Sequence, residues 1–163
     1  MSGEKRILQL LLDAVSGGVF PGAVLLVARH QKTLFCEAVG NGAVLPEPRL
    51  MTSETRFDLA SLTKPLATAL TVLCLVSQEK LQLDDSLAKL LPSTNIPQDK
   101  QEITLRQLLC HCSGLPAWKP YYLSLQTLHL KDRKASLRQM ILEEPLDSSP
   151  GTTTIYSDLG FLI

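Results

Sequence analysis

The segment from residue 57 to residue 78 restricts the fold of this chain more than any other part. Leu66, Leu70 and Leu73 recur at helical spacing, which predicts a helix over residues 61–78. Pro65 has no backbone N–H, so it fits only in the first turn of such a helix. The helix should therefore begin within a few residues of Ser61.

This placement puts a serine and a lysine side by side. Ser61 and Lys64 are three residues apart and share one helical face. A serine hydroxyl becomes a good nucleophile when a base removes its proton, and a lysine can be that base if burial or a neighbouring positive charge lowers its pKa. The N–H groups at the helix start also favour a developing oxyanion. Ser-x-x-Lys alone is a weak motif, because a capping serine followed by a solvated lysine is common; the apolar surroundings and Pro65 favour the catalytic interpretation.

A second polar motif, Tyr156-Ser157-Asp158, follows the turn at Pro150-Gly151. A tyrosine beside a serine and a lysine can carry a proton between nucleophile and leaving group, provided that a cation such as Lys64 supports its phenolate. The structural alternative is a tyrosine at the edge of the core followed by an ordinary helix cap. Tyr156 is therefore the candidate proton shuttle, and Asp158 a candidate contact for substrate.

A third motif is the corner at residues 111–116, which combines a helix end, a glycine and a proline. It can be purely structural, or it can line a pocket entrance together with Trp118 and Tyr121. His111 is a weaker candidate for the base of Ser61, because it lies at a helix C-terminus with no carboxylate nearby in sequence to orient it.

The run Cys110-His111-Cys112 resembles a metal-binding pattern only superficially. Its cysteines are one residue apart, and no second ligand pair follows at a zinc-site spacing. Small thiols at a helix end are the simpler explanation. We therefore expect neither a metal nor an organic cofactor.

The remaining sequence predicts an α+β fold. An amphipathic helix over residues 7–15 precedes a hairpin whose strands cover residues 23–28 and 33–40. Three short helices follow the nucleophile helix: one capped by Asp84 or Asp85 that ends before Pro92, one over residues 105–112 capped by Thr104, and one over residues 137–144 capped by Ser136. Two strands alone make a marginal sheet, so further strands are expected outside this sequence.

Composition excludes some classes of partner. The 16 basic and 16 acidic residues balance to zero net charge, and aromatic residues make up only 5% of the chain. Neither property is typical of a protein that binds nucleic acid or an anionic membrane. The best apolar run, residues 66–76, is too short to span a bilayer, and Asp13 interrupts the only stretch that resembles an export signal. A small-molecule substrate and a cytoplasmic location are the expectations, with the oligomeric state left open.

Five ordered segments together resemble the class C β-lactamase-related serine hydrolases, a group that includes serine esterases, D-aminopeptidases and D-alanyl-D-alanine carboxypeptidases. They span nearly the whole chain: Pro21-Gly22-Ala23, Phe57 to Pro65, Leu83 to Pro92, Ile103 to Pro116 and Pro150 to Gly160. The resemblance implies a β-lactamase/transpeptidase-like fold, in which an antiparallel sheet flanked by helices joins a mostly helical subdomain. It also implies that residues 1–163 belong to a single domain.

Carried onto this sequence, the resemblance implies that Ser61 forms the acyl-enzyme and that its backbone N–H is half of the oxyanion hole. Lys64 then either deprotonates Ser61 or holds Tyr156 in its active form. The family often has asparagine where this chain has Asp158, and its third motif, Lys-Thr-Gly or His-x-Gly, does not occur here. The domain is therefore expected to be incomplete at its C-terminal end, before the later strands.

The function implied is a serine hydrolase that acts through an acyl-enzyme on a small ester or amide. An ester is favoured over a cell-wall peptide or a β-lactam, because no export signal is expected. The alternative is an inactive relative that serves as an interaction or structural module.

Overall fold

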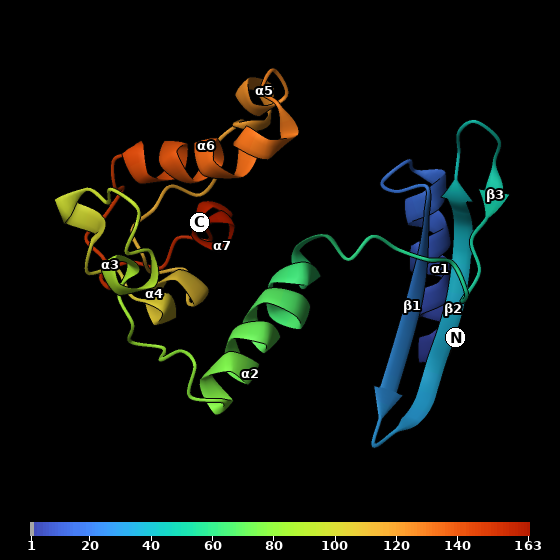
Figure 1. Ribbon diagram of the computed structural model, residues 1–163. Helices are drawn as coiled ribbons and strands as arrows, with labels where there is room; N and C mark the ends of the chain where they lie inside the picture. Colours follow the sequence, from blue (N-terminus) through green and yellow to red (C-terminus); the bar gives the residue numbers. More distant parts are fainter. Residues whose placement is uncertain (1) are drawn as a thin grey trace. The chain divides into compact units, whose positions relative to one another are not determined.

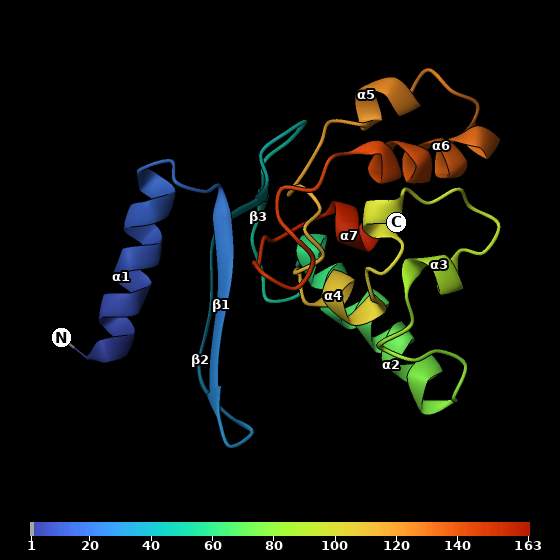
Figure 2. The same ribbon diagram turned by 90° about the vertical axis from the view of Figure 1, so that its left-hand side faces the viewer.

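A computed structural model describes residues 2–163 of the chain (Figures 1 and 2). The chain divides into two compact units, Met1–Asp58 and Leu59–Ile163. The first unit contains all the strands, and the second is helical, so the α+β expectation is confirmed.

The first unit is a helix and a small antiparallel sheet in the order β1-β2-β3, with the bounds α1 (Gly3–Ser16), β1 (Gly22–Arg29), β2 (Lys32–Ala43) and β3 (Arg49–Leu50). The predicted hairpin is confirmed, with Gly22 opposite Gly40 at its open end. A Cβ on Gly22 would lie 2.4 Å from the carbonyl oxygen of Asn41, so this close pairing requires glycine. The short strand β3 was not predicted, since a two-residue strand leaves no alternation to detect.

The second unit begins with a continuous helical run made of a 3₁₀ turn (Ala60–Leu62), a π segment (Lys64–Ala69) and α2 (Leu70–Ser77). Five short or medium helices and one 3₁₀ turn follow: α3 (Leu87–Leu90), the turn Gln98–Lys100, α4 (Leu105–Leu109), α5 (Tyr122–Leu125), α6 (Leu130–Glu143) and α7 (Leu159–Leu162). Its buried core is formed by Leu87, Ile96, Ile103, Leu108, Leu115, Ile141, Leu142 and Leu159.

The helix boundaries test the capping predictions. The helix expected before Pro92 is α3, but its cap is Ser86, whose hydroxyl accepts from the N–H of Lys89, so the prediction of Asp84 or Asp85 as the cap is wrong. Thr104 caps α4 in a reciprocal capping box with Gln107, as a threonine before this helix predicted. The prediction that Ser136 caps a helix is wrong, because α6 already begins at Leu130 and Ser136 lies inside it. The guanidinium of Arg133 donates to the carbonyl of Leu128 and anchors this earlier start.

The helical run from Ala60 to Ser77 is 18 residues long and apolar enough to cross a membrane by length and composition. The expectation that no run reaches this length is therefore wrong: the helix continues through the threonines that interrupt the leucines. Core helices of soluble proteins have the same composition, so this length by itself assigns no membrane location.

Candidate active site

The nucleophile segment begins with a strained residue. Ala60 has a φ of 43°, in the left-handed region that residues other than glycine seldom adopt. Ser61 follows in the 3₁₀ turn, and Pro65 occupies the first turn of the π segment. The sequence prediction that Pro65 marks a helix start beside Ser61 is confirmed. Backbone strain of this kind concentrates at functional sites.

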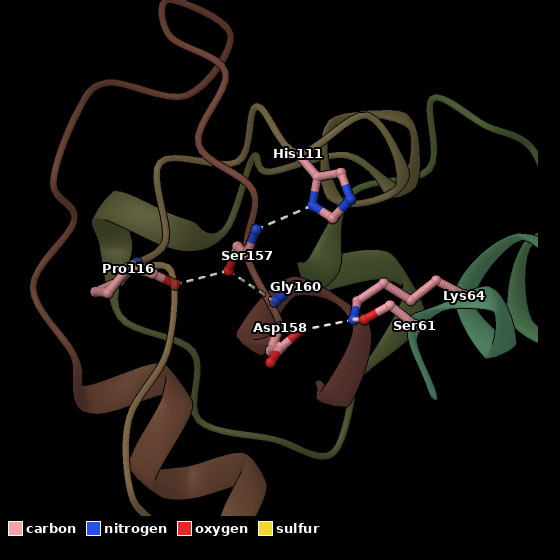
Figure 3. A network of polar contacts seen from close by, with 7 residues as sticks. All are labelled: Ser61, Lys64, His111, Pro116, Ser157, Asp158 and Gly160. Carbon is pink, nitrogen blue, oxygen red and sulfur yellow. Dashed lines mark hydrogen bonds and ion pairs between the residues drawn. The ribbon is translucent and has the colours of Figure 1, made fainter. Parts of the chain in front are cut away.

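Lys64 links Ser61 to a residue far along the chain. Its ammonium nitrogen lies 3.3 Å from Oγ of Ser61 and 2.6 Å from a carboxylate oxygen of Asp158 (Figure 3). The Lys64 side chain is 15% exposed and that of Asp158 38%. The hydrogen-bonded carboxylate of Asp158 raises the pKa of Lys64 above its ordinary value, and partial burial opposes this effect. A raised pKa keeps Lys64 cationic, which favours the alternative in which it holds Tyr156 in its active form over the one in which it deprotonates Ser61.

Tyr156 has the opposite perturbation. Hydrogen bonds with Ser61 and Lys64 lower the pKa of its phenol below the ordinary value, while desolvation and the charge of Asp158 act against them. The ammonium of Lys64 lies 5.0 Å from the centroid of the Tyr156 ring. Of the two candidate bases for Ser61, Tyr156 is the one that its surroundings make easier to deprotonate.

The backbone around Tyr156 is held by a buried polar network. The hydroxyl of Ser157 donates to the carbonyl of Pro116 at 2.7 Å and accepts from the N–H of Gly160 at 3.2 Å (Figure 3). Ser157 is 1% exposed, so water does not compete for these bonds. The N–H of Asp158 donates to the carbonyl of Ala117 at 2.8 Å. These bonds fix the tyrosine motif against the corner at residues 111–117.

His111 takes part in this network rather than acting on Ser61. Its Nδ1 accepts from the N–H of Ser157 at 3.0 Å (Figure 3). Partial burial and the charge of Lys64 lower the pKa of the imidazole, which favours a neutral ring. The alternative in which His111 is the base of Ser61 is not supported by this geometry.

Two cavities meet at Ser61 and Lys64. One, of about 620 Å³, is also lined by Tyr156 and His111, and most of its remaining wall is apolar. The other, of about 460 Å³, contains Asp158 and Trp118 beside the same serine and lysine. Both volumes are within the range of small-molecule sites.

Tyr121 is the one predicted site residue that the structure does not bring to these cavities. Its hydroxyl donates to the carboxylate of Glu144 at 2.9 Å, and its ring packs against the buried core. Burial and Glu144 raise the pKa of this phenol far above the ordinary value. The side chain joins α5 to α6 and is not available for a substrate.

Within residues 2–163, no group of three or more histidine, cysteine, aspartate or glutamate side chains is placed to hold a metal ion. Cys110 and Cys112 are both free thiols, and His111 between them uses Nδ1 for the bond from Ser157.

Sequence reasoning missed the contributions of His111 and Ser157. Ser157 was treated only as part of a possible helix cap, and its burial depends on a chain segment about 40 residues away. The usable signal for His111 was a histidine just past the end of a helix, because the residue there is often in the left-handed conformation and is then usually glycine. His111 has a φ of 57° at this position.

Comparisons with known proteins agree with this geometry. The sequence model of the β-lactamase family matches residues 8–163. An N-acetylmuramyl-L-alanine amidase of Bacillus subtilis (strain 168) is 30% identical over 172 residues, an alignment that covers 98% of this chain and 38% of the amidase. The chain thus spans less than half the length of this relative.

Solved structures show the same fold. EstCE1, described as a hydrolase with promiscuous acyltransferase activity, is 30% identical, with a TM-score of 0.72 over 97% of this chain and 44% of EstCE1. An octameric penicillin-binding protein homologue from Pyrococcus abyssi is 21% identical and has a TM-score of 0.77, over 99% of this chain and 37% of the homologue. The latter likeness concerns the fold alone. The family match, the shared fold and the Ser61–Lys64–Tyr156 cluster lead to one conclusion: this chain belongs to the β-lactamase family.

Proposed function

We propose that this chain carries the nucleophile machinery of a serine hydrolase that transfers an acyl group from a small ester or amide to Ser61. The observation that carries the proposal is the convergence of Ser61, Lys64 and Tyr156 on one cavity, with Lys64 held as a cation by Asp158. A cation beside a tyrosine stabilises the phenolate, which is the form that can accept a proton from serine.

In the proposed mechanism, the hydroxyl oxygen of Ser61 attacks the carbonyl carbon while its proton passes to the Tyr156 phenolate. The backbone N–H of Ser61 donates to the negative oxygen of the tetrahedral intermediate. Tyr156 then returns the proton to the departing alkoxide or amine, which leaves an ester between the acyl group and Ser61. A water molecule attacks this ester and gives a proton to the Tyr156 phenolate. Tyr156 passes that proton to the departing Ser61 oxygen, so the acid is released and the Ser61 hydroxyl and the phenolate are restored.

The charges at the site support a neutral substrate, with small esters first. The positive charge of Lys64 is already paired with Asp158, whose carboxylate is partly exposed in the same cavity. A substrate carboxylate placed there would meet a like charge, which costs binding energy. The apolar wall of the other cavity suits an uncharged acyl group.

Fluorophosphonate labelling of the purified chain tests the proposal, with mass mapping of the adduct and a panel of short p-nitrophenyl esters beside p-nitroanilides. Ser61→Ala should abolish the adduct, while Ser77→Ala, on the same helical run but remote from Lys64, should keep it. A folded chain that gains no adduct at Ser61 would refute the hydrolase proposal for this chain. Such a result would favour the alternative of a non-catalytic relative that serves as an interaction or structural module.

A further inference from the structure

One residue holds the chain on both sides of Tyr156. The Nδ1 of His111 accepts from the N–H of Ser157 at 3.0 Å (Figure 3). The backbone carbonyl of His111 accepts from the N–H of Ile155 at 2.8 Å. These two donors belong to the residues immediately before and after Tyr156. The backbone position of the tyrosine therefore depends on a histidine 45 positions earlier in the sequence.

The His111 ring also supports the tyrosine side chain. The two ring centroids are 4.4 Å apart with planes tilted by 31°, a spacing typical of favourable ring contacts. Phe161 lies on the imidazole as well, with centroids 5.1 Å apart. Tyr156 is 55% exposed, and its other side-chain contacts are the hydrogen bonds with Ser61 and Lys64 and the ammonium of Lys64 over its ring. The imidazole therefore helps to set the direction in which the phenol points.

The backbone of His111 has a conformation that favours glycine. Its φ of 57° is the left-handed conformation in which glycine is most comfortable and most other residues are strained. A residue that served only to turn the chain after α4 would be better as glycine. The imidazole is kept here at a conformational cost, which is the pattern expected of a functional side chain.

We propose that His111 is a positioning residue that sets Tyr156 against Ser61 and Lys64. The role requires a neutral imidazole protonated on Nε2, because Nδ1 must accept from Ser157. The charged or titratable groups around this pair are Lys64, Asp158 and the phenol itself, and the Lys64 cation disfavours a second positive charge on His111. The catalytic consequence rests on the function proposed above, whereas the structural role does not.

Two substitutions separate positioning from simple turn formation. His111→Asn tolerates the left-handed backbone and presents an amide oxygen near the place of Nδ1, so it should retain the bond from Ser157. His111→Gly relaxes the backbone but removes both the acceptor and the ring. A turn-forming role predicts that glycine is at least as good as asparagine; a positioning role predicts the reverse.

The first readout is the titration of Tyr156 in the full chain labelled with ¹³C-tyrosine, followed by NMR. The chain has three tyrosines, and Tyr156→Phe assigns the relevant signal. In the native chain and in His111→Asn, Tyr156 should titrate below the ordinary pKa of a tyrosine, because Ser61 and Lys64 lower its pKa. In His111→Gly its titration should move up toward that of an ordinary tyrosine. A folded His111→Gly chain in which Tyr156 titrates as in the native chain would overturn the proposal.

The second readout is the rate of fluorophosphonate labelling at Ser61. Misplacing a catalytic group by about 1 Å can cost on the order of a hundredfold in rate, so His111→Gly should label at least tenfold more slowly than the native chain, and His111→Asn within about threefold. If Ser61 of the native chain is not labelled but the Tyr156 titrations differ between the variants as expected, the hydrolase proposal fails and the positioning role of His111 stands.

If the glycine variant does not fold, His111→Gln takes its place in the comparison with His111→Asn. The longer glutamine side chain carries the amide oxygen away from the place of Nδ1, so this variant should behave like the glycine variant in both readouts. Equal behaviour of the glutamine and asparagine variants would overturn the proposal.

Discussion

Ser157→Ala should destabilise the Leu59–Ile163 unit more than any other single hydroxyl removal there. The Ser157 hydroxyl satisfies two backbone groups at once, the carbonyl of Pro116 at 2.7 Å and the N–H of Gly160 at 3.2 Å. Pro116 and Gly160 are themselves buried, so water cannot readily replace the lost partner. An unsatisfied buried backbone group costs about 1–3 kcal/mol, and two of them together predict a loss of about 2–6 kcal/mol.

Urea unfolding measures this loss directly, with the single tryptophan, Trp118, as the fluorescent probe of the second unit. With a urea dependence of about 2 kcal/mol per molar, a loss of about 3 kcal/mol moves the midpoint down by roughly 1.5 M. Far-UV circular dichroism should show the same midpoint for the helices of this unit.

Ser113→Ala is the matched control. Ser113 is as buried as Ser157, at 1% exposure, and its hydroxyl accepts one backbone bond, from the N–H of Leu115 at 3.3 Å. One unsatisfied group predicts about half the loss, roughly 1–3 kcal/mol. If Ser157→Ala shifts the midpoint no further than Ser113→Ala, the reasoning from satisfied partners is refuted.

Three further predictions concern charge, backbone and capping. Asp158 raises the pKa of Lys64, so their ion pair stabilises the fold fully below the lysine pKa of the unfolded chain, and this stabilisation is lost as pH rises through the lysine pKa of the folded chain. Asp158→Asn should remove this alkaline loss of stability in melting curves between about pH 9 and 12. An alkaline loss as large as that of the native chain would contradict the prediction. Gly114→Ala should destabilise by more than about 2 kcal/mol in urea, since its Cβ would lie 2.1 Å from a backbone oxygen at a φ of 80°. Gly151→Ala has a similar φ, but its Cβ would meet only the side-chain amide of Gln107, at 3.2 Å, so it should cost about 1–2 kcal/mol; equal losses would refute the collision argument. Thr104→Ala breaks the capping box of α4 and should lower the free energy of unfolding by about 1 kcal/mol, whereas Thr104→Ser should keep most of that stability. A serine variant as unstable as the alanine variant would show that the loss of the cap bond is not the cause.

Local rules were sufficient for the elements that carry the nucleophile. Pro65 predicted the helix start beside Ser61, and Thr104 predicted the start of α4, because both effects depend on bonds within a few residues. The hairpin followed in the same way from short apolar runs on either side of a polar tip. Where a local signal was ambiguous, as for Ser136 inside α6, the prediction failed.

Only the tertiary structure decided the protonation of the site. Asp158 lies 94 positions from Lys64 in the sequence, yet it contacts the ammonium and raises its pKa, the reverse of what a lysine base requires. Tyr121 likewise lies outside the site, because its hydroxyl donates to Glu144 and so links α5 to α6. The fold also brought His111 to both neighbours of Tyr156. Burial and through-space charge set a pKa, and neither can be read from sequence spacing. The sequence alone thus predicted which residues form the candidate site, and the packing of distant segments determined that Lys64 is paired with Asp158 there.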